Sequence, residues 1–370
     1  MTTLRTKKAS VAAALRRLRE RIDKLDRRIV NLLNRRAAVA VNIGAVKRRT
    51  GQAVYSPGRE RQIYDRVVAL NRGPLRAECV RAVYRELMSG SLALEKSLVI
   101  AYWGPPATYT HIAARRKFGD SVDYVPVSDI EGVFNEIARG RADHGVVPVE
   151  NSTEGGVNRT LDLFAETDVK VCGEIYLPIR HCLLGRGRPE GVRRIFSHPN
   201  ALGQCRRWLA HHYPEAEIRE AANTTQAAEL ASRDPASAAI ASDEAAKLYR
   251  LRILFRDLED RTDNVTRFFI LGRAFGGPTG RDKTSICFSI RDEVGGLYKT
   301  LVPFRRHGIN MTRIESRPSR RRAWEYLFFV DFEGHAAESR VRRALAALGR
   351  RCHVLQIMGS YPRETRKTRN

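Results

Sequence analysis

The stretch RTDNVTRFFILG, residues 261–272, combines an apolar run with side chains that bind anions or donate hydrogen bonds. Val265 and the apolar residues 268–271 predict a strand that enters a hydrophobic core. At the start of this strand, Thr266 offers a hydroxyl and Arg267 a guanidinium, groups that can contact a leaving oxygen and a carboxylate. The guanidinium can equally form a structural salt bridge, so both roles stay open for Arg267.

Three further polar clusters follow apolar runs, at residues 104–111 (GPPATYTH), 146–157 (VVPVENSTEGGV) and 197–205 (SHPNALGQC). Each cluster alone is typical of a helix N-cap. Four clusters at strand ends together favour a ligand site, because ligands of α/β folds bind at the carboxyl edge of the sheet. His198 could donate a proton there, although a His-Pro turn after a strand is more often structural.

The elements that must position these clusters alternate between strand and helix patterns over residues 98–276. Such alternation predicts an α/β domain with a largely parallel sheet.

Residues 15–47 follow a different pattern. Apolar residues recur there in steps of three and four, which is heptad spacing and predicts one long helix. At about 1.5 Å per residue the helix spans roughly 50 Å, more than its own short domain can cover. Its apolar seam therefore needs a partner, most simply an identical chain. The seam consists of Leu15, Leu18, Ile22, Leu25, Ile29, Leu32, Val39, Ile43 and Val46.

Charged residues interrupt this helical region. Arg36 lies on the apolar seam, and Lys47 follows about three turns later on the same face. Two buried cations are costly unless anions pair with them, which favours a pocket for a dianion. The alternative for Arg36 is a side chain that extends to solvent at the edge of a bundle. Two further predicted helices add Arg59, Glu60, Ser91 and Glu95 to this pocket.

The pattern Leu18-Arg19-Glu20, Asp26, Arg36, Gly44-x-x-Lys47, Arg59-Glu60 and Ser91…Glu95 resembles the all-helical chorismate mutase family. The resemblance implies an intertwined dimer and a Claisen rearrangement. That reaction needs a compact substrate conformer and positive charge at the ether oxygen rather than a nucleophile. By this resemblance, Arg19 would reach into the partner's site, and Arg36 and Arg59 would bind the substrate carboxylates. Lys47 would donate to the ether oxygen. Glu60 would bind the ring hydroxyl, and Ser91 would assist at the pocket wall.

Residues 98–276 carry their motifs in an order that resembles prephenate dehydratase, and DNVTRFF matches the Thr-Arg-Phe signature of that family. The resemblance implies two lobes like those of a periplasmic binding protein, with the site in the cleft between them. Thr266 would contact the departing hydroxyl, and Arg267 would bind a carboxylate or brace the lobes. Substrate contacts from the first lobe would come from Asn151, Ser152 and Thr153.

Three positions depart from these families. Ser56 stands where some mutases have Asp, and Glu95 stands where some have Gln. Gln always donates to the ether oxygen, whereas Glu donates only when protonated, so we expect a mutase that loses activity above neutral pH. Ala107 stands where dehydratases usually have Gly, and a positive φ there would strain the loop.

Residues 284–362 show a β-α-β-β-α-β pattern, which predicts a ferredoxin-like fold. The stretches IESRP and GGLYKTL resemble the ACT regulatory domain, which binds phenylalanine between paired subunits. The usual Gly-Ala-Leu-Val is Gly-Gly-Leu-Tyr here, which puts the affinity for the effector or its identity in doubt. The resemblance implies effector contacts at Gly295, Gly296, Leu297, Tyr298, Asn310, Glu315, Ser316, Arg317 and Pro318.

Length and composition set limits on these expectations. The 370 residues suffice for two or three domains, and no apolar run reaches the roughly 18–20 residues of a membrane span. Six cysteines without C-x-x-C spacing argue against zinc and disulfides and favour the cytoplasm. The net charge of +25 invites nucleic-acid binding, but no recognised motif accompanies it, so we expect no such partner.

The positive charge is unevenly distributed, since residues 1–97 hold 23 Lys and Arg against 8 Asp and Glu. The expected domains are a basic tail at 1–14, a helical mutase domain at 15–97, a dehydratase domain at 98–276, an ACT domain at 284–362 and a disordered tail at 363–370.

Together the three resemblances imply a bifunctional chorismate mutase/prephenate dehydratase. Chorismate would become prephenate, and prephenate would become phenylpyruvate with loss of CO2 and water, restrained by phenylalanine. We expect a homodimer or higher oligomer that needs neither metal nor organic cofactor. Two alternatives remain: a dehydratase for arogenate with a degenerate helical arm that only dimerises, and a non-enzymatic regulator that senses a ligand.

Overall fold

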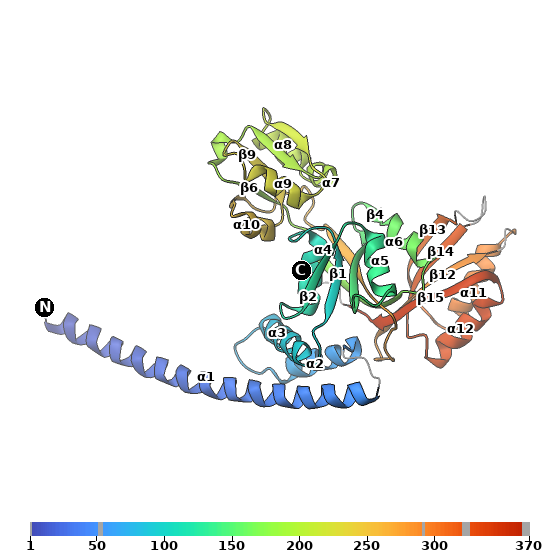
Figure 1. Ribbon diagram of the computed structural model, residues 1–370, viewed down its shortest axis with the longest axis horizontal. Helices are drawn as coiled ribbons and strands as arrows, with labels where there is room; N and C mark the ends of the chain where they lie inside the picture. Colours follow the sequence, from blue (N-terminus) through green and yellow to red (C-terminus); the bar gives the residue numbers. More distant parts are fainter. Residues whose placement is uncertain (1, 51–54, 291–292, 320–325, 365–370) are drawn as a thin grey trace.

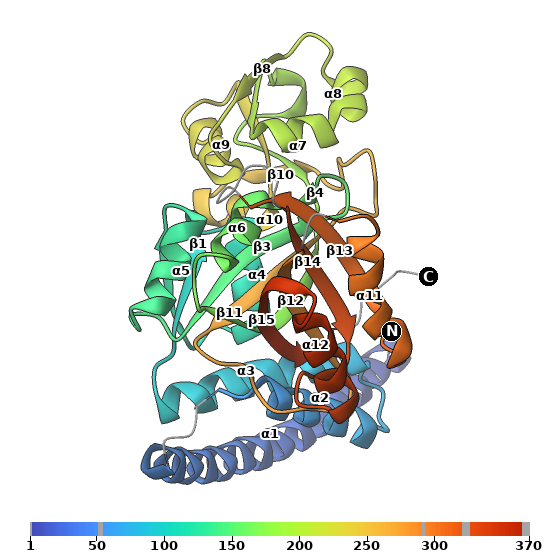
Figure 2. The ribbon, with the colours of Figure 1, turned by 90° about the vertical axis from the view of Figure 1, so that its right-hand side faces the viewer.

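The computed structural model describes residues 2–50, 55–290, 293–319 and 326–364, with side chains from residue 11 onward. It consists of three helices, a two-lobed α/β region and a C-terminal sheet with two helices, in that order along the chain (Figure 1). The first lobe lies at the centre, and the other parts surround it (Figure 2). No described helix combines the length and apolar character that crossing a bilayer requires.

The N-terminal helices are α1 Thr2–Thr50, α2 Pro57–Leu70 and α3 Ala77–Glu95. The helix expected at 15–47 is present but extends further at both ends, because helix-forming Ala, Arg, Lys and Leu dominate and no proline precedes Pro57. Residues 2–14, expected as a tail, are therefore helical.

The apolar seam of α1 is open to solvent. Leu18 is 52% exposed, Ile22 55% and Leu32 60%, and the N-terminal half of the helix projects away from the molecule (Figure 1). Only the C-terminal part of α1 packs on its own domain, chiefly against α3. A contiguous apolar row of this kind marks an interaction surface.

The first lobe is a sheet with strand order β2-β1-β3-β11-β5, and the short β4 pairs with β3. Helix α4 covers one face of this sheet, while α5 and α6 cover the other. The elements are β1 Val99–Trp103, α4 Tyr109–Phe118, β2 Asp123–Val127, α5 Ile130–Ala138, β3 His144–Asn151, β4 Gly155–Gly156, α6 Asn158–Phe164, β5 Lys170–Pro178 and β11 Val265–Gly272.

The second lobe is a sheet with strand order β10-β6-β9-β7-β8. Its elements are β6 Cys182–Gly185, the 3-10 helix Pro189–Gly191, β7 Arg194–Ser197, α7 Pro199–Gln204, α8 Arg206–His212, β8 Glu217–Glu220, α9 Thr224–Ala231, β9 Ser237–Ala241, α10 Asp243–Tyr249 and β10 Arg252–Phe255. The chain enters this lobe after β5 and returns before β11, so two crossings join the lobes.

Both sheets are largely parallel, as expected, but β11 and the short β4 in the first lobe and β6 in the second lobe run in the opposite direction. Strands β2, β1 and β3 pair in parallel, as do β8, β7 and β9. In contrast, β11 runs antiparallel to both β3 and β5, and β6 runs antiparallel to β9 and β10. The cause is the double crossing, because the strands next to each crossing enter their sheet from the other lobe.

The C-terminal region has the predicted β-α-β-β-α-β order and an antiparallel sheet with strand order β13-β14-β12-β15. Helices α11 and α12 cover one face of this sheet, and the first lobe lies against the other face (Figures 1 and 2). The elements are β12 Asp282–Ile290, α11 Gly296–Arg306, β13 Met311–Pro318, β14 Tyr326–Glu333, α12 Ser339–Gly349 and β15 Cys352–Pro362.

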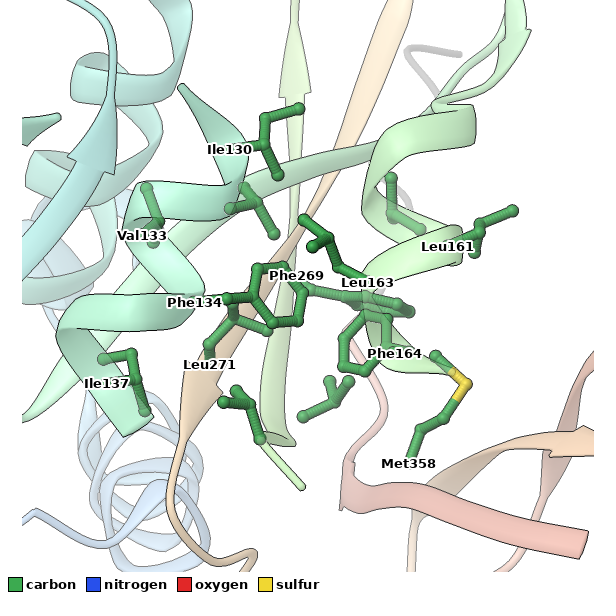
Figure 3. Close-up of a cluster of buried hydrophobic side chains, with 14 of the residues drawn as sticks. Ile130, Val133, Phe134, Ile137, Leu161, Leu163, Phe164, Phe269, Leu271 and Met358 are labelled. Atoms are coloured by element: carbon green, nitrogen blue, oxygen red, sulfur yellow. The ribbon is translucent and has the colours of Figure 1, made fainter. Parts of the chain in front are cut away.

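The first lobe and the C-terminal sheet share a hydrophobic core. In Figure 3, Phe134 of α5 and Phe164 of α6 pack around Phe269 of β11, and Met358 of β15 adds to the same cluster. At Gly359, a Cβ atom would lie 2.0 Å from the carbonyl oxygen of Val171, so only glycine allows this approach of β15 to β5.

The last described residues are bonded rather than loose. Arg363, which we expected in a disordered tail, donates its amide to the carbonyl of Arg281 at 2.9 Å. The amide of Glu364 donates to the carboxylate of Glu174 at 3.2 Å. Residues 365–370 of the expected tail lie outside the described residues.

A buried histidine makes the stability of this fold depend on pH. The His144 ring stacks on Phe118 and lies 3.1 Å from the carbonyl of Leu271, and burial lowers its pKa from 6.5 to about 4. Because the unfolded chain binds this proton at higher pH than the folded chain, stability is lost as the pH falls from 6.5 towards 4. The contribution of His144 to this loss is about 3 kcal/mol.

Replacing His144 by Gln should make the free energy of unfolding fall less steeply over this pH range. Urea denaturation of both proteins at several pH values measures the difference. If the free energy of unfolding changes with pH equally steeply in wild type and His144→Gln, His144 is not the cause of this pH dependence.

Candidate active sites

Thr266 and Asn151 meet at the end of two paired strands. They are register partners on β11 and β3, and the Thr266 hydroxyl oxygen accepts a hydrogen bond of 2.7 Å from Asn151 Nδ2. Thr266 is buried, with 9% of its surface exposed. Since its oxygen already accepts from Asn151, its own proton can be donated to a ligand.

The turn after β3 is held by its own side chains. The side-chain oxygen Oδ1 of Asn151 accepts from the amide of Thr153 at 2.9 Å and from the Thr153 hydroxyl at 2.6 Å. Turns held by such side-chain bonds are typical of Asn. The Ser152 hydroxyl accepts from the amide of Val265 at 3.0 Å and donates to the carbonyl of Asp263 at 3.0 Å. The structure therefore brings the predicted residues Asn151, Ser152 and Thr153 together beside Thr266.

An amide chain links this turn to the second lobe. Asn151 Nδ2 also donates to Asn264 Oδ1 at 2.9 Å, and Asn264 Nδ2 donates to Gln204 Oε1 at 2.7 Å. Gln204 ends α7 of the second lobe, and its Nε2 donates to Glu154 at 3.2 Å. The side chains of Asn264 and Gln204 thus link the two lobes.

His181 also contacts this series of hydrogen-bonded amide side chains. Its Nε2 lies 2.9 Å from Gln204 Oε1, and its ring is 2% exposed. Burial lowers the pKa of His181, although the hydrogen bond to Gln204 and the charge of Glu259 raise it. The ring is therefore neutral at pH 7 and donates from Nε2 to Gln204.

Sequence reasoning did not assign Gln204, Asn264 or His181 to the site. Gln204 falls within the polar cluster at 197–205, and Asn264 stands two residues before Thr266, so both could have been found there. His198, considered as a proton donor, accepts from the amide of Asn200 at 3.3 Å through Nδ1 and caps α7, and its role as a donor stays a prediction.

Ala107 occupies the strained conformation that its position suggested. Its φ is 67°, in the left-handed region that favours glycine. Its amide donates to His111 Nδ1 at 3.1 Å, and its carbonyl accepts from the Ser242 hydroxyl of the second lobe at 2.9 Å. These two bonds hold the loop although alanine costs roughly 1 kcal/mol there.

Arg267 points away from Thr266, because successive side chains of a strand face opposite sides of the sheet. Its guanidinium is 3% exposed and donates to Glu174, to Asp331 and, at 3.0 Å, to the Tyr361 hydroxyl. Asp331 and Tyr361 belong to the C-terminal sheet. This placement favours the bracing role, although the brace joins two domains rather than two lobes, and the carboxylate role stays a prediction.

The helical region gathers four of the predicted mutase residues. Arg36 donates to the Ser91 hydroxyl at 2.8 Å, and Lys47 pairs with Glu95 at 3.5 Å. Glycine at position 44 allows this approach, since a Cβ on Gly44 would lie 2.7 Å from Glu95 Cγ.

Three other predicted mutase residues lie elsewhere in the single chain. Arg59 donates to Gln62 on its own helix at 3.2 Å. Glu60 accepts from the Tyr55 hydroxyl at 2.7 Å and pairs with Lys117 of α4 at 2.8 Å. Arg19 is exposed on α1, about 25 Å along the helix from Arg36. The roles of these residues stay predictions.

The predicted effector residues divide between the two faces of the C-terminal sheet. Glu315 pairs with Arg313, and Arg317 pairs with Asp162 of the first lobe at 3.2 Å. Ser316 and Pro318 alternate with these two residues along β13, so they face the other side of the sheet, and both are exposed. On the helix-covered side, Gly295 caps α11 with a φ of 74° ahead of Gly296, Leu297 and Tyr298. Asn310 immediately precedes β13.

Comparison with known proteins identifies three regions. Residues 18–96 match the family model "Chorismate mutase type II", residues 100–275 match "Prephenate dehydratase" and residues 284–350 match "ACT domain". The bifunctional chorismate mutase/prephenate dehydratase of Aquifex aeolicus is 47% identical over 354 residues, which covers 94% of this chain and 98% of that protein.

Two solved structures resemble the part after the helices. Prephenate dehydratase from Arthrobacter aurescens in complex with L-Phe is 34% identical with a TM-score of 0.67, covering 72% of this chain and 90% of that one. The quorum quenching acylase GqqA is 31% identical with a TM-score of 0.66, covering 72% of this chain and 98% of that one.

Replacing Gln204 by Met should destabilise the protein by about 1–3 kcal/mol, because Asn264 and His181 would lose their shared acceptor. Chemical denaturation measures this change. Gln62→Met is the matched control, since Gln62 is exposed and accepts from Arg59, and it should change stability by less than about 0.5 kcal/mol. Equal effects of the two substitutions would refute a structural role for the amide chain.

Proposed function

The chain belongs to the bifunctional chorismate mutase/prephenate dehydratase family, and from that membership we propose how its residues divide the two reactions. The enzyme rearranges chorismate to prephenate and converts prephenate to phenylpyruvate. The observation that carries both activities is the match of relatives over 94% of the chain, mutase region included. The likeness to GqqA covers 72% of this chain and therefore does not account for all of it.

In the mutase reaction, we propose that Arg36 and Arg59 bind the two carboxylates of chorismate and that Lys47 donates to the ether oxygen. The rearrangement breaks a C–O bond while a C–C bond forms, so electron density grows on that oxygen and a fixed cation stabilises it. The bond from Arg36 to Ser91 supports this proposal by holding the guanidinium in place before substrate binds. Glu60 would bind the ring hydroxyl.

We further propose that the mutase site is completed by a second copy of the chain. Arg19 is about 25 Å along α1 from Arg36 and cannot reach its own site. The exposed apolar seam of α1 supports a paired helix, and a homodimer would cover it. We place this homodimer in the cytoplasm, in keeping with its described cysteines, which are all free thiols.

In the dehydratase reaction, we propose that Thr266 donates a hydrogen bond to the departing ring hydroxyl. Breaking the bond to CO2 releases an electron pair into the ring, which becomes aromatic, and the hydroxyl leaves with the pair of its own broken C–O bond and takes up a proton to become water. The bond that Thr266 accepts from Asn151 fixes its oxygen and leaves its proton available. Asn151, Ser152 and Thr153 would hold the substrate from the first lobe.

For regulation, we propose that phenylalanine binds the ACT domains of paired subunits and favours a conformation in which the dehydratase cleft is inactive. The L-Phe complex of the Arthrobacter aurescens relative supports this ligand. Contacts would come from residues 295–298, Asn310 and residues 315–318. Arogenate, with an amine where prephenate has a keto group, is the alternative substrate that the motifs do not exclude.

A single reaction of purified protein with chorismate, with products identified by chromatography and mass, tests the proposal. We expect phenylpyruvate, and we expect phenylalanine to suppress its formation. Accumulation of prephenate would leave the mutase in place and reject the dehydratase. Unchanged chorismate would reject the mutase, and supplying prephenate and arogenate separately would then show which substrate the cleft accepts.

Glu95→Gln should flatten the pH profile of the mutase. Glu95 pairs with Lys47 at 3.5 Å, and it can donate to the ether oxygen only when protonated, whereas Gln donates at every pH. We expect wild-type mutase kcat/KM to fall by about tenfold between pH 7 and 9 and the variant to remain nearly constant. The rate of the same protein with prephenate is the control, and a flat wild-type profile would contradict the role of Glu95.

A further inference from the structure

Two successive residue pairs on β11 and β3 face opposite sides of the sheet. Thr266 pairs with Asn151 towards the cleft, and Arg267 pairs with Glu150 towards the C-terminal sheet. The first pair is joined by the 2.7 Å hydrogen bond, and the second by an ion pair of 3.7 Å. Any shift of Glu150 along or across the sheet therefore moves Asn151 relative to Thr266.

The strand pairing is irregular at this point. Arg267 pairs with Glu150 and Phe268 pairs with Pro148, so β3 has one additional residue there. A bulge of this kind re-aims the side chains beside it and needs outside contacts to fix its geometry. The side chains at this bulge, Arg267 and Glu150, are charged, and residues of the C-terminal sheet pair with both of them.

On the β11 side, Arg267 is locked by a buried ionic cluster. Its partner Glu174 also pairs with Lys283 of β12 at 2.9 Å, and its partner Asp331 accepts from the Ser285 hydroxyl at 2.5 Å. All of these side chains are at most 5% exposed. Buried charges are retained only with such complete pairing, so Arg267 cannot move without the C-terminal sheet.

On the β3 side, Glu150 is held by the edge strand of the same sheet. Arg313 of β13 lies 3.5 Å from the Glu150 carboxylate and also pairs with Glu315. The Glu315 carboxylate lies so close to Gly156 that a Cβ there would be 2.3 Å from it. Gly156 itself pairs with Glu150 across β4 and β3, so β13 contacts both sides of the turn that carries the substrate residues.

We propose that Glu150 is a positioning residue of the dehydratase: through Arg267 and Arg313, the C-terminal sheet sets the distance between Asn151 and Thr266. The proposal rests on the dehydratase function assigned above and adds the path by which the regulatory region acts on it. A shift of β13 relative to β14 changes the two ion pairs of Glu150 and thereby the donor geometry of Thr266.

The test is Glu150→Gln in the full-length enzyme, which keeps the shape of the side chain and removes its charge. Dehydratase kcat with prephenate should fall roughly 10- to 100-fold, as expected for a small displacement of a donor. KM should change less than about threefold, because Glu150 would not touch substrate. The phenylalanine concentration for half-inhibition should shift by more than about threefold, and mutase kcat should stay within about twofold.

Asp162→Asn is the matched control. Asp162 pairs with Arg317 of the same strand β13, and its side chain is 10% exposed, but it lies on α6 rather than on β3. Losing this ion pair should leave dehydratase kcat within about twofold of wild type. If both variants lose kcat equally, general weakening of the domain contact explains the effect and the proposal is rejected.

The remaining outcomes also decide the question. If the wild type converts prephenate and Glu150→Gln has the same dehydratase kcat, the inference is overturned and the proposed function stands. If the wild type does not convert prephenate, the dehydratase function itself is rejected. A rise in KM at constant kcat would make Glu150 a substrate contact instead. If Glu150→Gln folds poorly, Arg313→Gln provides the second test, and hydrogen exchange of the amides at 151–156 should accelerate in either variant if the turn has been released.

Discussion

Successive side chains of strand β11 face opposite sides of its sheet, and through them this one strand joins the first lobe to the C-terminal sheet. On strand β11, Thr266 contacts Asn151 on one face, whereas Arg267 pairs with the C-terminal sheet and Phe269 packs in the hydrophobic core on the other. A one-residue slip would place the guanidinium in the cleft and the hydroxyl in the ionic cluster. Removing one partner of such a buried cluster costs about 3–5 kcal/mol, so this register is strongly favoured over any other.

The three regions of the chain contact one another very differently. The C-terminal sheet shares a core with the first lobe, admits no side chain at Gly359 and contributes charged partners to Arg267 and Glu150. The helical region contacts the first lobe both through polar groups, among them the pair of Glu60 and Lys117, and through Tyr55 and Leu92, which pack against its hydrophobic cluster. The C-terminal sheet is therefore joined to the first lobe by both a shared core and buried charges.

Sequence patterns predicted the local structure well and the long-range structure less well. Heptad spacing predicted α1, and the Thr-Arg-Phe motif predicted β11 and the neighbourhood of Thr266 with Asn151, because both signals lie in a few adjacent residues. Strand periodicity also fixes that Arg267 faces away from Thr266, but no periodicity identifies Asp331 as its partner 64 residues later. Likewise, Gln204 is a plain helix-end amide until the two lobes bring it to Asn264. The antiparallel strands were missed because direction depends on where the chain crosses between lobes.

The central position of β11 also sets the order in which the chain can fold. Strand β11 pairs with both β3 and β5, yet it is separated from β5 by the whole second lobe. The second lobe is a continuous stretch of chain and can fold as soon as it leaves the ribosome. The first lobe must wait for residue 272, and its core is finished only when Met358 arrives. The first lobe is thus completed late during synthesis, when the C-terminal sheet is nearly complete.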